Sequence, residues 1–365
     1  MRVRFDDQIF SATHRRGGIS NYFVNLISQF EENVDLGIEP IGLPLISFNH
    51  HLEEAGRATV PKLALLERRR ALHALNVVQH ARNRVRGQAA EDVLHQTYYF
   101  NPSWRPRQRR PVAVTVYDMM PEMYPKEVGP NNPHFHKDFH IRHADVILCI
   151  SETTKNDMLS FYPDLDVPIF VTPLGVAPMF KPSAHSATED YLLYVGTRSF
   201  NKNFSMFARA AARAISGTDL RIKIVGGGVF RPDEIQFLSS IGLSDKVDFL
   251  RPSDAELVGL YQNALAFVFP TKYEGFGLPT IEAMASGCPA ILAPTSALQE
   301  IAGDAGIMVP EYTDDAFEHS IRTVISDPEL RKRAREAGIE QAAKFSWSGT
   351  ARLTAEAYAH ALSVR

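Results

Sequence analysis

Short apolar runs rich in β-branched and aromatic residues alternate with helical stretches along most of this chain. Five of these runs occupy residues 112–116, 146–150, 191–195, 222–225 and 265–269. Strands that alternate with helices form parallel sheets covered by helices, so the pattern predicts an α/β protein. Each run ends in a loop that contains Gly, Asp, Ser or Pro. Because open α/β sheets bind their ligands where the strands end, we expect the chemistry at those loops.

The length of the chain predicts two domains. Its 365 residues suffice for two hydrophobic cores. A Pro-rich, polar segment at residues 176–186 interrupts the alternation and is typical of a linker. We therefore expect an N-terminal Rossmann-like domain over residues 1–180 that binds the acceptor and a C-terminal one over 181–345 that binds the donor. A last helix over 346–365 can cross back to the N-terminal domain.

Composition excludes several classes of protein. Hydrophobic residues make up 45% and charged residues 22%, which excludes disordered and fibrous chains. A net charge of −3 gives no reason to expect a nucleic-acid partner. Cys149 and Cys288 are far apart in apolar runs, so a reducing, cytoplasmic compartment is expected. With no apolar run of about 18 residues, any membrane contact should be peripheral.

The most informative segment is residues 269–289, FPTKYEGFGLPTIEAMASGCP. A strand ends there, a glycine-rich turn follows, and a helix begins near Pro279. Glycines allow close approach, and the first N–H groups of a helix are unpaired, so the turn suits a diphosphate. Glu274 at the mouth of the turn and Glu282 about one helical turn inside should bracket one small volume and accept hydrogen bonds from sugar hydroxyls. The residues expected to bind the phosphates are Gly275, Phe276, Gly277, Leu278 and Thr280.

Glu274, seven intervening residues and Glu282, with Gly-Phe-Gly-Leu-Pro between them, resemble the signature of the fourth family of retaining glycosyltransferases. The resemblance covers nearly the whole chain and is strongest over residues 191–306. It implies the GT-B fold, with two Rossmann-like domains facing an interdomain cleft. It also implies a nucleotide-sugar donor as co-substrate, no metal and no other cofactor. In this family the first Glu contacts the transferred sugar and the second contacts the ribose.

A second glycine turn opens the C-terminal domain. Gly196 is followed by Arg198 and Lys202, and two cations four residues apart can bind a diphosphate leaving group. The resemblance assigns both to the phosphates, while ordinary solvated charges at a helix start are the alternative. The family's nucleotide-base region matches Gly226 and the segment with Leu250 or Arg251.

Weaker patterns lie in the N-terminal domain. Gly18 follows another glycine before an amphipathic helix, which suits a phosphate or an acceptor, or a plain turn. Tyr117 and Asp118 end a strand where many relatives have His before the Asp to contact the donor sugar. Tyr117 can donate a hydrogen bond but does not titrate near neutral pH. His95 is either part of an acceptor site or a structural histidine.

Three further patterns are interpreted with less weight. Asp164 and Asp166 resemble a metal-binding Asp-x-Asp but lie in a Pro-bounded connection, and His136 and His140 lack a carboxylate cluster, so no metal is expected. Ser151 or its neighbour Thr154 should cap a helix. Arginine-rich segments at 67–86 and 104–110 suit an anionic membrane surface or a lipid-linked acceptor, and a solvated helix face explains them equally well.

Together these patterns predict a retaining, metal-independent glycosyltransferase that moves a hexose or deoxyhexose to a hydroxyl of a growing, lipid-linked surface polysaccharide at the inner face of the plasma membrane. The segment Tyr-Asp-Met-Met-Pro-Glu resembles bacterial O-antigen and capsule transferases, which favours GDP-mannose or a GDP-deoxyhexose as donor. A UDP-sugar donor, a GT-B-fold sugar-nucleotide epimerase and a non-catalytic assembly partner are the alternatives. A nicotinamide dehydrogenase is excluded because its Gly-x-Gly-x-x-Gly fingerprint is missing.

Overall fold

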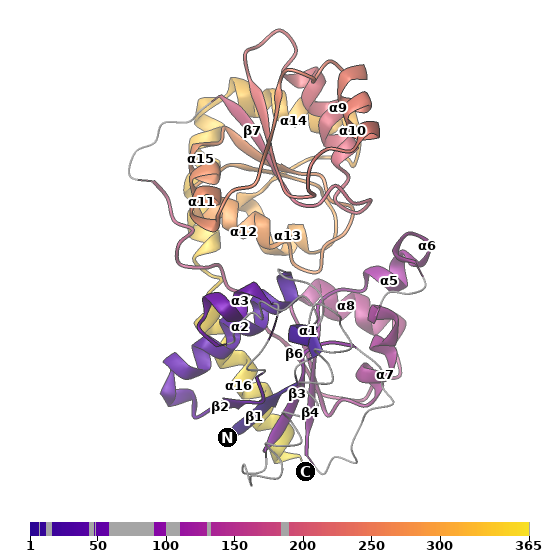
Figure 1. The fold of residues 1–365 in the computed structure, drawn as a ribbon, viewed down its shortest axis with the longest axis vertical. Helices are drawn as coiled ribbons and strands as arrows, with labels where there is room; N and C mark the ends of the chain where they lie inside the picture. The colour runs from indigo at the N-terminus through magenta and orange to yellow at the C-terminus, as the bar shows by residue number, and fades with distance from the viewer. Residues whose placement is uncertain are drawn as a thin grey trace. The chain divides into compact units, whose positions relative to one another are not determined.

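The computed structural model describes residues 1–6, 8–11, 17–43, 47, 49–57, 91–99, 110–129, 133–183 and 190–364. The chain forms two compact units (Figure 1). The first comprises Met1–Leu174 and Trp347–Arg365, and the second comprises Gly175–Ser346. The division lies a few residues before the expected boundary at 180, because Val176 and Phe180 pack against the core of the second unit.

The first unit is built on a six-stranded parallel sheet in the order β2-β1-β3-β4-β5-β6. Its strands are β1 (Arg2–Phe5), β2 (Glu39–Ile41), β3 (Val93–Gln96), β4 (Val112–Val116), β5 (Val146–Cys149) and β6 (Ile169–Val171). The three strands β3, β4 and β5 are buried along their whole length, as the continuous apolar runs of a covered parallel sheet require.

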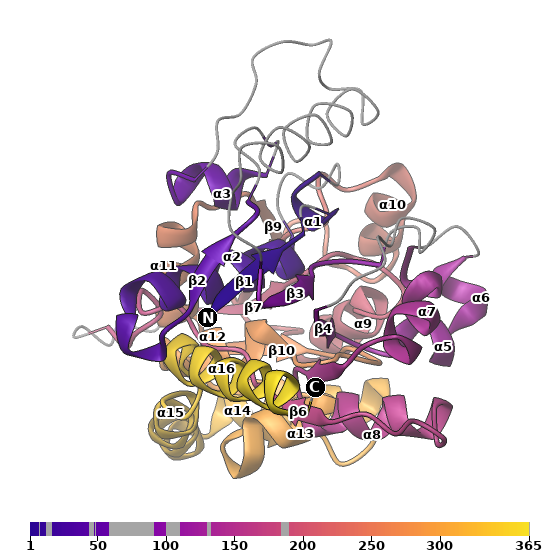
Figure 2. The same ribbon diagram turned by 90° about the horizontal axis from the view of Figure 1, so that it is seen from below.

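The helices of the first unit are mostly short. They are α1 (Gln8–Ser11), α2 (Gly18–Glu32), α3 (His50–Glu54), α5 (Met120–Met123), α6 (Pro125–Val128), α7 (Lys137–Arg142), α8 (Glu152–Phe161) and α16 (Trp347–Ser363). Ser151 caps α8, since its hydroxyl accepts a hydrogen bond from the N–H of Thr154. The final helix, α16, packs against α2, β5 and β6 (Figure 2).

A buried polar chain fastens α16 to the sheet. Tyr358 of α16 lies 2.6 Å from Nδ1 of His95, and Nε2 of His95 lies 2.8 Å from Oγ1 of Thr115 on β4. All three side chains are buried, and burial lowers the pKa of His95 to about 3. His95 is therefore a neutral structural histidine with both ring nitrogens paired, and it does not face an acceptor.

The second unit has a six-stranded parallel sheet in the order β12-β11-β10-β7-β8-β9. Its strands are β7 (Tyr191–Val195), β8 (Arg221–Val225), β9 (Val247–Leu250), β10 (Ala266–Phe269), β11 (Ala290–Leu292) and β12 (Ile307–Met308). The chain goes from β7 outward to β8 and β9 and returns to β10 on the other side of β7. This reversal creates a topological switch point between β7 and β10, where open α/β sheets bind ligands.

The helices of the second unit connect these strands. They are α9 (Phe204–Ala214), α10 (Pro232–Ser240), α11 (Asp254–Asn263), α12 (Leu278–Ala285), α13 (Ala297–Ala302), α14 (Asp314–Ser326) and α15 (Pro328–Ala342). The α/β class with two parallel sheets is thus confirmed. Over the described ranges, every helix is too short or too polar to cross a lipid bilayer.

Candidate active site

Two loops at the carboxyl edge of the second sheet are joined to each other. One follows β7 and the other follows β10, the two strands at the switch point. The main-chain N–H of Lys272 donates to the carbonyl of Asn201 at 2.6 Å, and Oγ1 of Thr271 lies 3.0 Å from the same carbonyl oxygen. The side chains that the sequence assigned to these separate loops are thereby brought together.

An ion pair between Lys202 and Glu274 lies at this junction. The Nζ atom of Lys202 is 2.6 Å from Oε1 of Glu274, and the two side chains are 18% and 13% exposed. The hydroxyl of Thr271 donates to the same carboxylate oxygen at 2.7 Å. The ammonium also lies 4.8 Å from the centre of the Phe269 ring. A cation and a carboxylate, each available to a different part of a ligand, thus occupy the switch point.

The backbone on both sides of this ion pair is strained. Asn203, directly after Lys202, and Ser296 have φ angles of 47° and 49°, and they are the non-glycine residues with positive φ among those the structure describes. The hydroxyl of Ser296 accepts a hydrogen bond of 2.9 Å from the N–H of Glu274. Such conformations cost about 1–3 kcal/mol and persist only where their surroundings enforce them, and they cluster at functional sites.

Helix α12 begins beside the ion pair without a side-chain cap. Its N-cap residue is Gly277, with φ 88° and no side-chain hydrogen bond to the first turn. Glycine suits this position because other residues rarely adopt a φ of 88°, and an added Cβ atom would lie 2.6 Å from the Leu298 side chain. In the first turn, the hydroxyl of Thr280 is buried and has no hydrogen-bond partner among the residues that the structure describes. Uncapped N–H groups and an unpaired hydroxyl at a helix start suit a phosphate.

The other residues of this turn can offer a ligand only their main-chain groups. The ring of Phe276 is 2% exposed and packs edge-on against Phe345 at 5.6 Å, so only its backbone can reach a ligand. Gly275 lies between Glu274 and this ring, and Leu278 is the first residue of α12. Gly196 lies against the side chain of Lys202, because a Cβ atom added to Gly196 would be 3.7 Å from that side chain.

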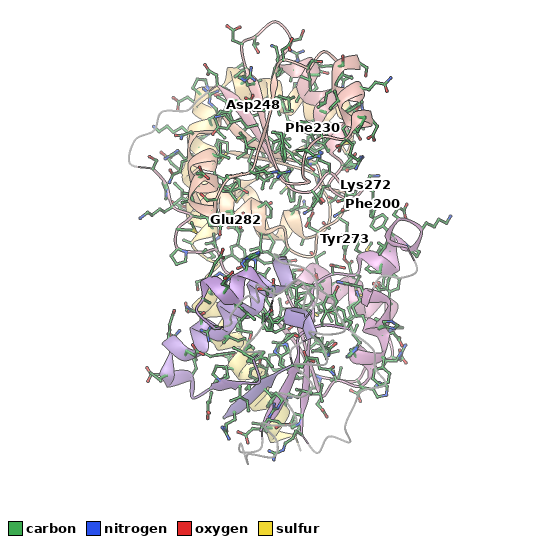
Figure 3. The ribbon with its side chains drawn as sticks, viewed as in Figure 1. Phe200, Phe230, Asp248, Lys272, Tyr273 and Glu282 are labelled. Atoms are coloured by element: carbon green, nitrogen blue, oxygen red, sulfur yellow. The ribbon has the colours of Figure 1, made fainter. Side chains whose placement is uncertain are left out.

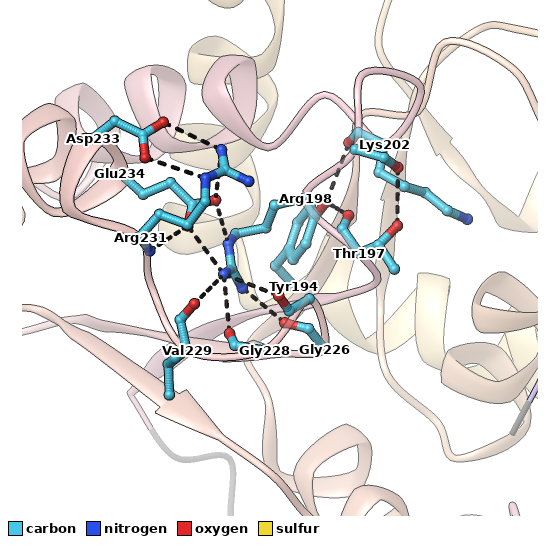
Figure 4. Close-up of polar contacts among 12 residues, drawn as sticks. Tyr194, Thr197, Arg198, Lys202, Gly226, Gly228, Val229, Arg231, Asp233 and Glu234 are labelled. Carbon is cyan, nitrogen blue, oxygen red and sulfur yellow. Dashed lines mark hydrogen bonds and ion pairs between the residues drawn. The ribbon is translucent and has the colours of Figure 1, made fainter. Parts of the chain in front are cut away.

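Arg198 does not share this environment with Lys202. Its guanidinium is 2.7 Å from Glu234 and donates to the carbonyl of Gly226 at 2.8 Å. Figure 4 shows Arg198 directed toward the glycine loop after β8, and Lys202 directed away from it. The side chain of Arg198 is 3% exposed. The predicted pair of phosphate-binding cations is therefore divided between two places.

Glu282 has surroundings different from those of Glu274. It lies in α12, where its Oε2 accepts a hydrogen bond of 3.3 Å from the hydroxyl of Tyr261 on α11. Burial raises the pKa of Glu282 to about 7, and the negative charge of Asp254 adds to this shift. Figure 3 shows Glu282 apart from Tyr273, the neighbour of Glu274. The two carboxylates thus have separate partners.

The predicted site residues of the first unit differ in their exposure and in their hydrogen-bond partners. Tyr117 is 6% exposed, its hydroxyl is 3.4 Å from the carbonyl of Thr97, and burial raises its pKa well above the ordinary value. Its hydroxyl is therefore a poor replacement for an imidazole at neutral pH. A carboxylate oxygen of Asp118 accepts from the N–H of Met120 at 3.0 Å. Gly18 is exposed at the start of α2, where no side chain caps the helix.

Sequence reasoning missed several residues that shape these loops. Lys137 is completely buried, donates to the carbonyl of Asp118 and pairs with Glu122 at 3.0 Å. A lysine in an amphipathic helix is normally solvated, so its sequence context gave no signal. Glu234 follows Arg231-Pro232-Asp233 at a helix start, where it accepts a hydrogen bond from the N–H of Arg231, and nothing in that local sequence indicates a partner for Arg198.

The structure describes Asp164 and one end of the basic segments. Asp164 is exposed and pairs with Arg142 at 3.3 Å. Within the described part of the chain, no group of three His, Cys, Asp or Glu residues could hold a metal ion. The basic segments at 67–86 and 104–109 lie outside the described residues. Arg110, at the end of the second segment, lies 3.7 Å from Asp92.

Residues 177–341 match the model of the family Glycosyl transferases group 1. The second unit carries a group 1 glycosyltransferase domain. This match agrees with the glycosyltransferase resemblance of the Glu274 and Glu282 pattern. The matched segment contains both loops of the switch point, α12 and the glycine loop after β8.

Known proteins similar to this chain include two curated relatives. The O-antigen chain mannosyltransferase B of Escherichia coli is 26% identical over 291 residues, which cover 74% of this chain and 76% of the relative. The D-inositol 3-phosphate glycosyltransferase of Nocardia farcinica is 27% identical over 308 residues, covering 74% and 67%.

Solved structures show the same fold. A protein of Anabaena, crystallised with UDP and glucose, superimposes with a TM-score of 0.72 at 16% identity. The match covers 99% of this chain and 100% of the Anabaena chain. The predicted GT-B fold is confirmed by this similarity across both units.

Proposed function

We propose that this protein is a retaining glycosyltransferase that moves a hexose or deoxyhexose from a nucleotide sugar to an acceptor hydroxyl. The observation that carries the proposal is the Lys202–Glu274 ion pair at the switch point, beside the uncapped start of α12. A diphosphate can bind to the cation and the N–H donors of this arrangement, and sugar hydroxyls can bind to its carboxylate.

The parts of a donor would divide between these groups. Lys202, the hydroxyl of Thr280 and the main-chain N–H groups from Phe276 to Leu278 bind the diphosphate. Glu274 exchanges Lys202 for the hydroxyls of the transferred sugar, and Glu282 binds the ribose. Before a donor binds, the ion pair neutralises both charges. When it binds, the diphosphate replaces Glu274 as the partner of Lys202, and the sugar hydroxyls replace Lys202 as the partners of Glu274.

In the proposed reaction the bond between the anomeric carbon and the diphosphate oxygen breaks. The acceptor oxygen forms its bond to the same face of that carbon, and its proton passes to an oxygen of the leaving phosphate. Lys202 and the N–H groups of α12 stabilise the negative charge that develops on the leaving group. Glu274 stabilises the positive character of the sugar ring. No metal takes part in this proposal.

GDP-mannose or a GDP-deoxyhexose is the proposed donor, and a lipid-linked surface polysaccharide at the inner membrane face is the proposed acceptor. The similarity to an O-antigen chain mannosyltransferase supports mannose as the transferred sugar and an O-antigen-type chain as the acceptor. A UDP-sugar is the second candidate, because UDP and glucose occupy the Anabaena structure that matches nearly the whole chain.

The proposal is tested first by thermal unfolding of the intact protein with GDP, UDP, ADP or dTDP. A nucleotide that binds the folded state raises the melting temperature. GDP should give the largest rise, and a larger rise with UDP would favour the second candidate. Sugar transfer is then measured with the matching donor. Absence of stabilisation by every nucleotide at millimolar concentration would contradict the proposed function.

A further inference from the structure

The start of helix α13 holds the main chain of Glu274. The hydroxyl of Ser296 accepts a hydrogen bond of 2.9 Å from the N–H of Glu274. The next residue, Ala297, places its N–H 3.5 Å from the carbonyl oxygen of Glu274. Two consecutive residues after β11 therefore contact both main-chain polar groups of Glu274, which lies in the loop after β10. Since β11 and β10 are neighbours in the sheet, these contacts join two adjacent loops.

Ser296 makes this contact from an unfavourable backbone conformation. Its φ and ψ angles are 49° and −141°, a combination that residues other than glycine rarely adopt. The other end of the same helix provides a comparison within the chain, because Gly303 there has a φ of 51° and a ψ of −145°. A glycine thus adopts this conformation at one end of α13 and a serine adopts it at the other. What serine adds at position 296 is the hydroxyl that accepts from Glu274.

A second contact from the same loop reaches the residue beside the carboxylate. Oγ1 of Thr295 donates to the carbonyl of Thr271 at 2.9 Å. Thr271 is fully buried, and its own Oγ1 lies 2.7 Å from Oε1 of Glu274. The loop after β11 therefore fixes both the main chain of Glu274 and the threonine that contacts its carboxylate.

This support matters most when the ion pair with Lys202 is broken. The Nζ atom of Lys202 is 2.6 Å from Oε1 of Glu274, and in the proposed reaction the diphosphate takes that cation. The hydrogen bond of Ser296 is to the main chain of Glu274, so it can persist when the carboxylate changes partners. A carboxylate stabilises a developing positive charge best when it is held in place beforehand. The support should therefore contribute more to the rate of transfer than to nucleotide binding.

We propose that Ser296 is a positioning residue for Glu274, and that its strained backbone is retained because the hydroxyl fixes this carboxylate for sugar transfer. The inference rests on the proposed function, in which Glu274 contacts the transferred sugar. It adds to the site a residue outside the segment 269–289, and that residue acts through Glu274 without touching the donor.

Two substitutions separate the hydroxyl from the backbone conformation. Ser296→Gly removes the hydroxyl and relieves the strain, whereas Ser296→Ala removes the hydroxyl and keeps the strain. Thr313→Ala is the control, because this exposed hydroxyl also accepts from a helix N–H, that of Ala316 in α14, at 3.2 Å. For each intact protein we measure sugar transfer from GDP-mannose or UDP-glucose, calorimetric binding of GDP and UDP, thermal unfolding, and amide hydrogen exchange of Glu274.

Both Ser296 variants should lower kcat by about tenfold to a hundredfold, the effect of a misplaced catalytic group. Their affinity for GDP or UDP should stay within about twofold of the wild type, because the nucleotide does not depend on this support. Ser296→Gly should unfold about 2–4 °C above Ser296→Ala, because it is free of the strain. Exchange of the Glu274 amide should rise in both variants. Thr313→Ala should lose stability while keeping its rate and the slow exchange of that amide.

A double substitution tests whether Ser296 acts through Glu274. In the Glu274→Gln background, Ser296→Gly should change kcat by less than about twofold, since no carboxylate is left to position. A further loss of about tenfold in that background would overturn the inference.

Three other results would also overturn it: a wild-type rate in Ser296→Gly, unchanged exchange of the Glu274 amide, or a loss of nucleotide affinity in parallel with kcat. The glycine variant keeps the test decisive if Ser296→Ala does not fold. If the wild type binds neither GDP nor UDP, the proposed function fails, while amide exchange still decides whether Ser296 holds Glu274.

Discussion

At the scale of single residues, similar side chains in this protein differ in what surrounds them. Lys202 and Arg198 are four apart in sequence, yet one pairs with Glu274 at the switch point and the other with Glu234 in α10. The sequence could identify both as cations beside a glycine turn. It could not separate them, because Glu234, which pairs with Arg198, lies 36 residues further along the chain.

Replacement of Lys202 by Met should lower kcat/KM for sugar transfer by roughly 2–4 kcal/mol, the loss expected when a charge that stabilises the leaving group is removed. Lys272→Met is the matched control, since Lys272 is an exposed lysine in the neighbouring loop. Steady-state rates with the donor identified by thermal unfolding provide the measurement. A rate within threefold of the wild type would exclude Lys202 from the leaving-group site.

Replacement of Glu282 by Gln should stabilise the protein at alkaline pH while weakening nucleotide binding. The pKa of Glu282 is raised from 4.5 to about 7, so the folded state holds a proton that the unfolded chain has released. Stability of the wild type therefore falls as pH rises from about 4.5 to about 7 and is constant above that range. At pH 8 the variant should gain on the order of 3 kcal/mol, and near pH 4.5 the gain should vanish.

This difference is measured by urea unfolding at several pH values between 4.5 and 8, together with calorimetry of nucleotide binding. Glu256→Gln serves as the control, because Glu256 caps an exposed helix start and its pKa is lowered rather than raised. Equal stability of Glu282→Gln and wild type at pH 8 would contradict the burial argument. Undiminished nucleotide affinity would contradict the ribose role.

At the scale of helices and strands, the sequence predicted where elements lie along the chain better than it predicted which segments contact each other. The run 222–225 became β8 (Arg221–Val225), and the helix expected near Pro279 begins at Leu278, because apolar runs and glycine turns act locally. The strain at Ser296 and the burial of Lys137 were not predictable. Each depends on contacts between segments distant in sequence, which no local pattern records.

The attachment of α16 should depend on one buried hydrogen bond. Tyr358→Phe removes the partner of Nδ1 of His95 and leaves a buried polar atom unpaired, which costs about 1–3 kcal/mol. Because the pKa of His95 is about 3, the loss should be the same at pH 6 and pH 8. Urea unfolding at both values measures it, with Arg352→Ala on the exposed side of α16 as control. A loss that grows as pH falls from 8 to 6 would show that His95 is protonated within this range.

At the scale of the whole molecule, two parallel α/β sheets follow directly from the alternation of strands and helices. The family motif lies entirely in the second unit, where the resemblance was strongest. The first unit follows the sequence expectation less closely: His95 and Tyr117 are buried, and the basic segments at 67–86 and 104–109 lie outside the described residues. Motifs predict the donor site because phosphates demand particular backbone geometry, whereas acceptors impose no common pattern.

Turnover of the whole enzyme should survive removal of divalent cations. In the proposed reaction Lys202 and the start of α12 neutralise the leaving diphosphate, a task that a metal performs in other transferases. Sugar transfer is measured with and without excess EDTA and after addition of Mg²⁺ or Mn²⁺. Activity lost in EDTA and restored by either ion would require a metal in the mechanism.

The return of α16 to the first unit has a consequence for the order of folding during synthesis. The second unit is an insertion within the first, and its two ends meet, since the N–H of Val176 donates to the carbonyl of Phe345 at 3.2 Å. The first unit lacks α16 until residues 347–363 have been synthesised, whereas the second unit is complete before α16 is made. The second unit should therefore fold first on the ribosome, and the first unit is completed only when Tyr358 reaches His95.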